Sequence, residues 1–126
     1  MQTSELTDYE KNTLLPRVKL GIKKRKGPHY AITARKIAHV LVSQGYDADV
    51  ESVKNILHYI RTNGLVNGII KDSTGFYVAE SDQRIEQHIE NLKEMKQSID
   101  EIIAALESQR VESAMEAETE QQTENQ

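Results

Sequence analysis

The sequence of 126 residues contains no cysteine, no tryptophan and a single phenylalanine. Without cysteine the chain has no disulfide framework, no thiolate metal site and no cysteine nucleophile. The opening residues, MQTSELTDYEK, lack the apolar stretch of a signal peptide, and no apolar run approaches the length of a membrane span. Hydrophobic residues make up only 37%, so we expect a small globular domain plus a non-globular extension in a soluble, intracellular protein.

Residues with catalytic or metal-binding chemistry are also sparse. The four histidines fall in four different expected elements, and none stands at metal-ligand spacing from another histidine or a nearby carboxylate. No glycine-rich loop is followed by the Lys-Ser or Lys-Thr pair of a phosphate-binding loop. We therefore expect no enzymatic activity, no metal, no cofactor and no small-molecule substrate. The histidines are interpreted as surface residues and the hydroxyl side chains as helix caps.

Charge is divided unevenly along the chain. The net charge is −4, but residues 1–79 carry 12 Lys and Arg against 7 Asp and Glu, whereas residues 80–126 carry 4 against 13. A basic globular half with an acidic extension fits a nucleic-acid-binding protein, and it also fits many adaptor proteins.

The first half of the chain predicts three helices. Thr7 and Glu10 form a capping box for the first, which restarts near Pro16 and ends before the Gly27-Pro28 pair. Thr33 caps a second helix that stops at Gly45. Asp49 caps a third helix that stops at Asn63-Gly64, and its apolar stripe faces the core. The stripe consists of Val50, Val53, Ile56, Leu57 and Ile60.

Two short extended runs follow and predict a β-hairpin. The first begins at Leu65-Val66 and continues through Ile69-Ile70-Lys71, and the second is Phe76-Tyr77-Val78. Gly75 supplies the positive φ that a four-residue hairpin loop tends to need.

A long final helix is expected from Ser81, its cap, to about Arg110. Apolar residues recur along it at heptad spacing, except where Lys96 interrupts the pattern, and they predict self-association of the chain. Two other interpretations stay open: the first turns pack back on the domain, or the helix is unpaired. Residues 111–126 are acidic and poor in apolar groups, which predicts a disordered tail. The expected oligomerisation residues are Ile85, Ile89, Leu92, Ile99, Ile103 and Leu106.

The runs ITARKIAHVL and DVESVKNILHYIRTNGLV, followed by the hairpin ending GFYVA, resemble winged helix-turn-helix proteins of the small stand-alone kind found in bacteriophages and mobile elements. The resemblance covers about residues 7–80. It implies a mainly α (α+β) fold: three helices and a two-stranded wing in residues 1–80, before the long helix of residues 81–110. It also implies a DNA-binding transcriptional regulator or a replication or recombination accessory factor, in the cytoplasm of a bacterial cell or host.

Two groups of residues are therefore expected to contact double-stranded DNA. Cations at the end of the first helix, in the next loop and at the start of the second helix would hold phosphates. The outer face of the third helix would meet the groove, with one lysine near the wing tip. These residues are Lys23, Lys24, Arg25, Lys26, Arg35, Lys36, Ser52, Lys54, Asn55, His58, Tyr59, Arg61 and Lys71.

One feature of the third helix opposes direct reading of bases. Asp49 and Glu51 lie at its N-terminal end, where carboxylates would repel phosphate. The alternative function is therefore a winged-helix protein-interaction or assembly factor that does not bind DNA directly.

Overall fold

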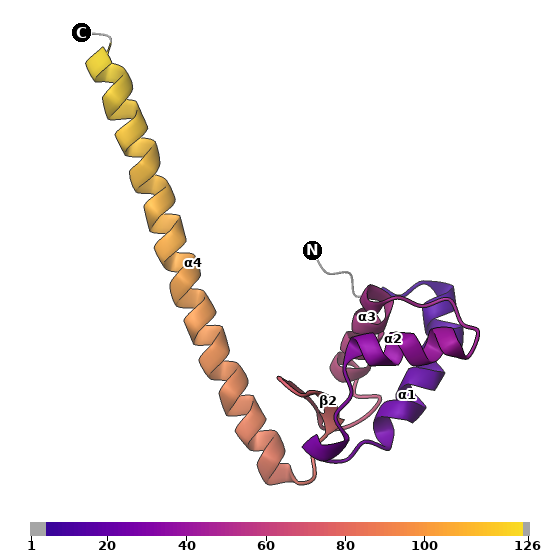
Figure 1. The fold of residues 1–126 in the computed structure, drawn as a ribbon. Helices are drawn as coiled ribbons and strands as arrows, with labels where there is room; N and C mark the ends of the chain where they lie inside the picture. Colours follow the sequence, from indigo (N-terminus) through magenta and orange to yellow (C-terminus); the bar gives the residue numbers. More distant parts are fainter. Residues whose placement is uncertain (1–4, 125–126) are drawn as a thin grey trace. The chain divides into compact units, whose positions relative to one another are not determined.

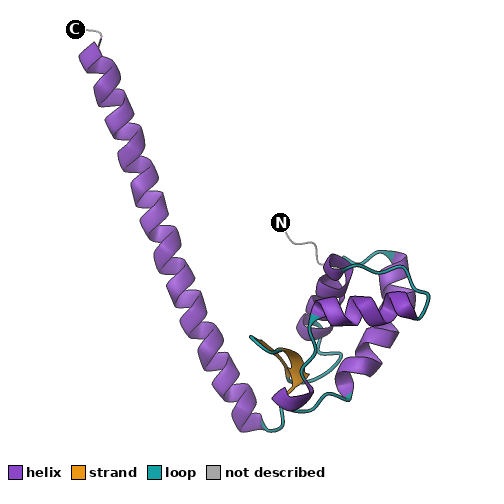
Figure 2. Ribbon diagram, in the orientation of Figure 1, coloured by secondary structure: helices purple, strands orange, loops and turns teal. Residues whose placement is uncertain are grey.

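The computed structural model describes residues 5–124, with side chains described from residue 5 to residue 116. The protein is mainly helical, with one small antiparallel sheet and a long C-terminal helix (Figures 1 and 2). The order is a π-helical turn (Glu10–Leu14), α1 (Leu15–Lys23), a 3-10 turn (Pro28–Tyr30), α2 (Ala34–Ser43), α3 (Val50–Thr62), β1 (Ile69–Asp72), β2 (Gly75–Val78) and α4 (Asp82–Glu124). The chain divides into two compact units, one up to Glu86 and one from Gln87 onward.

The start of the first helical region follows the sequence prediction. The Thr7 amide donates to Glu10 Oε1 (2.9 Å), and the Glu10 amide donates to Thr7 Oγ1 (3.1 Å), which completes the predicted capping box. A π-helical turn then precedes α1, and Pro16 lies in the first turn of α1. The helical run is continuous from Asp8 to Lys23, and the Leu15 amide still donates to the Glu10 carbonyl of the π-helical turn; Pro16, which has no amide hydrogen, follows directly.

The ends of α2 and α3 also follow the predicted signals. Thr33 Oγ1 accepts from the Lys36 amide (3.1 Å), and Asp49 Oδ1 accepts from the Ser52 amide (2.8 Å). Gly45 and Gly64, with φ of 93° and 63°, end the two helices. After Gly64 the Leu65 amide donates back to the Ile60 carbonyl (3.1 Å), the bond of a Schellman cap.

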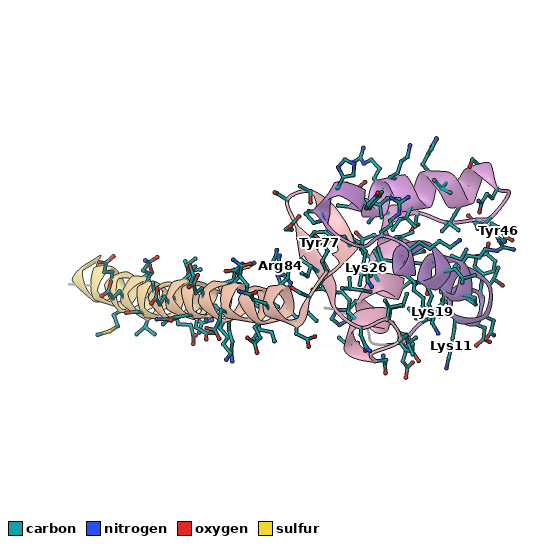
Figure 3. The ribbon with its side chains drawn as sticks, turned by 90° about the horizontal axis from the view of Figure 1, so that it is seen from below. Lys11, Lys19, Lys26, Tyr46, Tyr77 and Arg84 are labelled. Atoms are coloured by element: carbon teal, nitrogen blue, oxygen red, sulfur yellow. The ribbon has the colours of Figure 1, made fainter. Side chains whose placement is uncertain are left out.

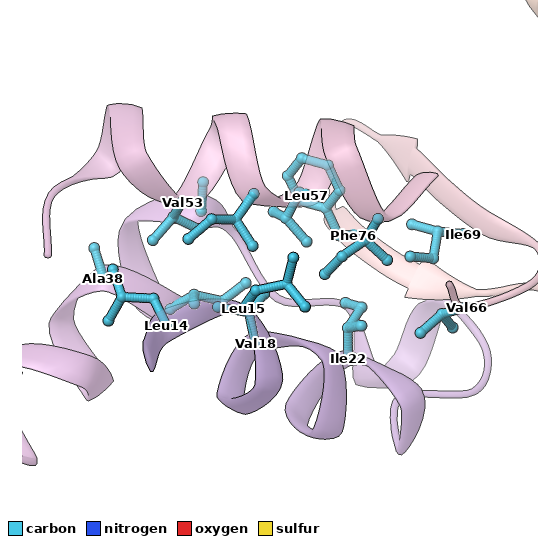
Figure 4. Close-up of a cluster of buried hydrophobic side chains, with 14 of the residues drawn as sticks. Leu14, Leu15, Val18, Ile22, Ala38, Val53, Leu57, Val66, Ile69 and Phe76 are labelled. Carbon is cyan, nitrogen blue, oxygen red and sulfur yellow. The ribbon is translucent and has the colours of Figure 1, made fainter. Parts of the chain in front are cut away.

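The core of the first unit joins all three helices and one face of the hairpin. Figure 4 shows Val53 and Leu57 of α3 facing Leu14 and Val18 from the first helical region, with Phe76 of β2 between Leu57 and Ile69. The buried positions of α3 fall at the steps of three and four residues that the sequence predicted.

The hairpin is shorter than predicted. Leu65 and Val66 are not extended, because Gly64 and Gly68 both adopt positive φ and the intervening residues form turns. β1 therefore begins at Ile69, and Asp72 pairs directly with Gly75, so two residues form the loop instead of four. Gly75 does have a positive φ, of 127°.

β2 has backbone partners on both of its edges. On one side it pairs with β1, and on the other Lys26 bridges Val78 and Ile32 bridges Phe76. The Ile32 and Phe76 amides each donate to the other residue's carbonyl, at 3.0 and 2.8 Å. The segments before and after the 3-10 turn are thus fixed against the hairpin.

The other face of the hairpin contacts the first turn of α4. Ile70, Tyr77 and Ala79 form a second buried cluster against which Ile85 packs. Ser81 caps α4, since its Oγ accepts from the Arg84 amide (3.2 Å). Ile85 is half-buried and contacts the globular unit, so its position agrees with the interpretation in which the first turns pack back on the domain.

The helix α4 extends beyond the predicted limit of Arg110. It continues to Glu124, whereas the sequence predicted a disordered tail from residue 111, and residues 125–126 lie outside the described part of the chain. Residues 111–124 contain no glycine or proline and are rich in Glu, Gln and Ala, which favour helix.

Candidate nucleic-acid interface

The predicted basic run lies at the end of α1 and in the loop that follows it. Lys23 is the last residue of α1, Lys24 is its C-cap, and Arg25 and Lys26 belong to the loop. The side chains of Lys23, Lys24 and Lys26 are exposed, whereas Arg25 is half-buried. Figure 3 shows Lys26 following Lys19 and Lys11 along the same side of the first helical region.

The backbone of this loop is fixed on both sides of Lys26. The Val78 amide donates to the Arg25 carbonyl (2.7 Å), and the Gly27 amide donates to the Val78 carbonyl (2.9 Å). Arg25 Nη1 donates to the Tyr30 carbonyl (2.9 Å), so this guanidinium helps to hold the loop. The lysines are therefore presented from an ordered backbone, which lowers the entropy cost of binding an anion.

The basic run forms no ion pair among the described residues, although the Glu80 carboxylate lies beside its last residues: Oε1 is 2.8 Å from the Cβ position of Gly27. The ion pairs among the described residues are Lys54–Glu51, Arg84–Asp72 and Lys93–Glu90, and none includes a residue of the Arg17–Lys26 run. Arg17 lies over the Tyr46 ring at 4.4 Å from its centroid, a cation–π contact that stabilises the guanidinium without removing its net charge. The run therefore keeps a concentrated positive charge beside the hairpin.

Arg35 and Lys36 lie in the first turn of α2, where both side chains are exposed. Their helix begins two residues after Ile32, which bridges Phe76, while Lys26 bridges Val78 two residues farther along β2. Because a strand rises about 3.3 Å per residue, the two attachment points are only about 7 Å apart along β2. The loop that carries the first group of cations and the segment that leads into α2 are therefore attached to β2 at neighbouring residues.

The predicted residues of α3 do not share one face. Successive helical residues are rotated by about 100°, which places Glu51, Asn55 and His58 opposite the buried stripe. Tyr59 and Arg61 lie about 160° apart on its two flanks. Both are half-buried, as is Asn55, and Tyr59 also packs against the main core. The expected groove-facing residues near the centre of the outer face are therefore the half-buried Asn55 and the exposed His58.

Several α3 side chains have a structural role. Asp49 is the N-cap, and the amide of Ser52 lowers the pKa of its carboxyl, followed in effect by the Ser52 hydroxyl. Burial lowers the pKa of Arg61, although an arginine remains charged at neutral pH. Lys54 lies 3.9 Å from Glu51 on an exposed surface. The carboxylate of Asp49 thus caps α3, and Lys54 lies beside the carboxylate of Glu51.

The hairpin contributes one predicted cation and one cluster that the sequence did not indicate. The exposed Lys71 Nζ lies 5.9 Å from the centroid of the Phe76 ring. Tyr77 OH donates to Asp72 Oδ2 (2.8 Å), and Arg84 Nη2 donates to Tyr77 OH (3.0 Å). Figure 3 labels Tyr77 and Arg84 where the hairpin meets α4. These residues were missed because only the folded hairpin brings positions 72, 77 and 84 together.

The heptad residues of α4 from Ile89 to Leu106 are exposed, with exposed fractions from 42% for Leu92 to 57% for Leu106. Met95 and Ile102, which the heptad assignment left out, are equally exposed, at 58% and 56%. These seven side chains form an apolar stripe without a partner among the described residues; they are Ile89, Leu92, Met95, Ile99, Ile102, Ile103 and Leu106.

An apolar groove of about 170 Å³ lies between α1 and α2. Arg17, Arg25 and Gln44 are its polar lining residues, and the rest of its lining is aliphatic or glycine. In the part of the chain that the structure describes, no three His, Asp or Glu residues are grouped to hold a metal ion, and no helix is long and apolar enough to cross a membrane.

Comparison with known proteins adds no relative. No protein-family model, curated protein or solved structure matches this chain.

Proposed function

We propose that the first unit is a winged helix-turn-helix domain that binds double-stranded DNA and catalyses no reaction. The element order supports this: α1, a short bridge to the sheet at Ile32, α2, α3, and then the β1–β2 hairpin as the wing. The resemblance of residues 7–80 to small phage and mobile-element proteins supports the same assignment, as a transcriptional regulator or a replication or recombination accessory factor.

The observation that carries the proposal is the exposed basic run on a fixed backbone, which forms no ion pair among the described residues. Lys23, Lys24 and Lys26 would hold phosphates beside the hairpin, and Arg35 and Lys36 would extend the contact to α2. Asn55 and His58 would approach base edges from the centre of the outer face of α3. Most of the affinity would come from the phosphate backbone, because few α3 side chains are placed for base contacts and Glu51 opposes close approach.

The chain would act as a dimer. The apolar stripe of α4 is too long and too exposed to remain unpaired at high concentration, and a second copy of the same helix offers a matching stripe. Dimerisation would couple two weak DNA contacts and raise their combined affinity.

The test of DNA binding is a gel-shift titration on mixed-sequence duplex DNA at low and moderate salt. Replacing Lys23, Lys24 and Lys26 by alanine should weaken binding at least tenfold, since each lysine that neutralises a phosphate supplies a salt-dependent share of the affinity. Arg25 is kept because its guanidinium holds the Tyr30 carbonyl. The matched control replaces the same three lysines by arginine, which conserves the charge and should preserve binding.

Two results would contradict the proposal. One is the absence of any shift at low salt, and the other is equal affinity for the alanine and wild-type chains with equal melting temperatures. Either result would favour the protein-interaction alternative, for which the acidic α4 and the exposed Glu51 are the supporting features.

A further inference from the structure

The residues that border the apolar stripe of α4 constrain how a second copy can pair with it. In the heptad of residues 89–106, Ile89, Lys96 and Ile103 occupy the a positions, and Leu92, Ile99 and Leu106 occupy the d positions. Met95 and Ile102 occupy the neighbouring g positions, while Lys93 and Asp100 occupy the e positions on the other side. One border of the stripe is therefore apolar and the other is charged.

A parallel pair of these helices would be poorly matched. Each a residue would face its own copy, so Lys96 would face Lys96 inside the seam, where like charges are destabilising. The g side chains would meet the e side chains of the second copy in the following heptad. Met95 would then meet Asp100, and Ile102 would meet Glu107, so that apolar groups would contact carboxylates on both borders.

We infer that two copies of this chain associate through an antiparallel pairing of residues 89–106 of α4. With Lys96 level with Ile99 of the second copy, Ile89 packs with Leu106 and Leu92 packs with Ile103, and each layer forms twice. The inference rests on the self-association proposed above and adds its direction and register.

Within residues 89–106, both borders of the stripe have matching partners in this arrangement, whereas Glu86 and Glu107, at the flanking e positions, would face each other. In an antiparallel pair g residues meet g residues and e residues meet e residues, so Met95 contacts Ile102 of the second copy. Lys93 meets Asp100 in the same way and gains a partner beyond Glu90, from which it lies 3.6 Å in the single helix. The aliphatic stem of Lys96 covers Ile99, and its ammonium extends toward Asp100.

The charges within residues 89–106 favour this register over its one-heptad shifts. A shift of one heptad in one direction would place Lys93 against Lys93, and a shift in the other direction would place Asp100 against Asp100. Within residues 89–106, the central register is the one in which every e-position contact joins opposite charges; the register with Asp100 against Asp100 would also pair Lys93 with Glu107, just beyond that segment. The antiparallel direction also places the two globular units at opposite ends of the paired segment, whereas a parallel pair would place them at the same end.

Spin-label distances along α4 test the direction. The chain has no cysteine, so single cysteines at the outward f positions Gln87, Glu94, Glu101 and Ser108 each give one label per copy in the full-length protein. At a rise of 1.5 Å per residue, the axial separation between copies should be about 31 Å at positions 87 and 108 and about 10 Å at positions 94 and 101.

The outcomes are distinct. A distance that falls from position 87 to the middle and rises again to position 108 supports the antiparallel pair. Equal distances at all four positions mean a parallel pair and overturn this inference while leaving self-association intact. The absence of any dipolar coupling at high protein concentration overturns both, and neither result affects the DNA-binding test.

A charge exchange tests the register independently. Lys93→Glu and Asp100→Lys should each weaken dimerisation about fivefold, because each creates two like-charged contacts per dimer, and the double variant should recover the wild-type affinity. Glu94→Lys, at an outward position, is the matched control and should leave dimerisation unchanged. Failure of the double variant to recover would overturn the proposed register.

Discussion

At the scale of single residues, two glycines differ in what their missing side chain permits. A Cβ at Gly75 would lie 2.7 Å from the carbonyl carbon and oxygen of Ile32, and the φ of 127° disfavours any other residue. Gly75→Ala should therefore destabilise the first unit by about 2 kcal/mol or more, as the hairpin is displaced from Ile32. Thermal unfolding followed by circular dichroism measures the loss of stability.

Gly21→Ala is the matched control for that substitution. Gly21 lies within α1, has no heavy atom within 4 Å of its Cβ position and does not have a positive φ. Alanine should stabilise the helix there by about 0.5–1 kcal/mol, because it restricts the unfolded chain more than glycine does. Equal effects of the two substitutions would contradict the close approach of Ile32 to the hairpin.

Asp72 gives the protein a pH dependence of known sign. The Thr74 hydroxyl, the Thr74 amide and Tyr77 donate to this carboxylate, and with the Arg84 charge they lower its pKa below the ordinary 3.8, against an opposing effect of burial. The unfolded chain therefore binds the proton more tightly than the folded chain. The stabilisation is complete well above pH 3.8 and is lost as the pH falls through the lowered pKa of the folded state.

Asp72→Asn isolates this contribution. The melting temperature of wild type should exceed that of the variant near neutral pH, and the gap should shrink as the pH is lowered below about 4. Unfolding curves at intervals between pH 2 and 7 make the comparison. A gap that stays constant over this range would show that the Asp72 charge does not stabilise the hairpin.

At the scale of secondary-structure elements, local signals predicted the helices better than the segments between them. Thr33 and Asp49 cap α2 and α3 as expected, since capping depends on residues only three positions apart. Leu65 and Val66 have the composition of a strand, yet the glycines at 64 and 68 turn the backbone there. The acidic composition of residues 111–124 predicted disorder, although their helix propensity is high.

The division between the two units predicts what truncation does. A chain ending at Glu86 keeps the three helices, the hairpin and the Ile85 contact, so it should fold. It lacks the exposed stripe of α4 and should be monomeric, whereas the full chain should show about twice its formula mass at high concentration. Light scattering of both chains provides the measurement, and a monomeric full chain would contradict dimerisation through α4.

At the scale of the whole molecule, the charge of the candidate interface was predictable from the sequence, whereas its geometry was predictable only in part. The excess of cations in residues 1–79 is visible in the sequence, but their position depends on long-range contacts. Only the folded chain brings Lys26 to Val78 and Ile32 to Phe76, and with them the two basic groups. The flanking positions of Tyr59 and Arg61 likewise follow from how α3 rotates its buried face toward the core.

The dependence of DNA affinity on salt tests the central proposal most directly. The full chain, titrated on mixed-sequence duplex DNA across a range of salt concentrations, should show log affinity falling linearly with log salt, with a slope of about −3 or steeper. Replacing Lys23, Lys24 and Lys26 by alanine should make that slope shallower by about one for each phosphate that is no longer neutralised. A slope near zero, or the same slope for both chains, would contradict DNA binding through the basic run.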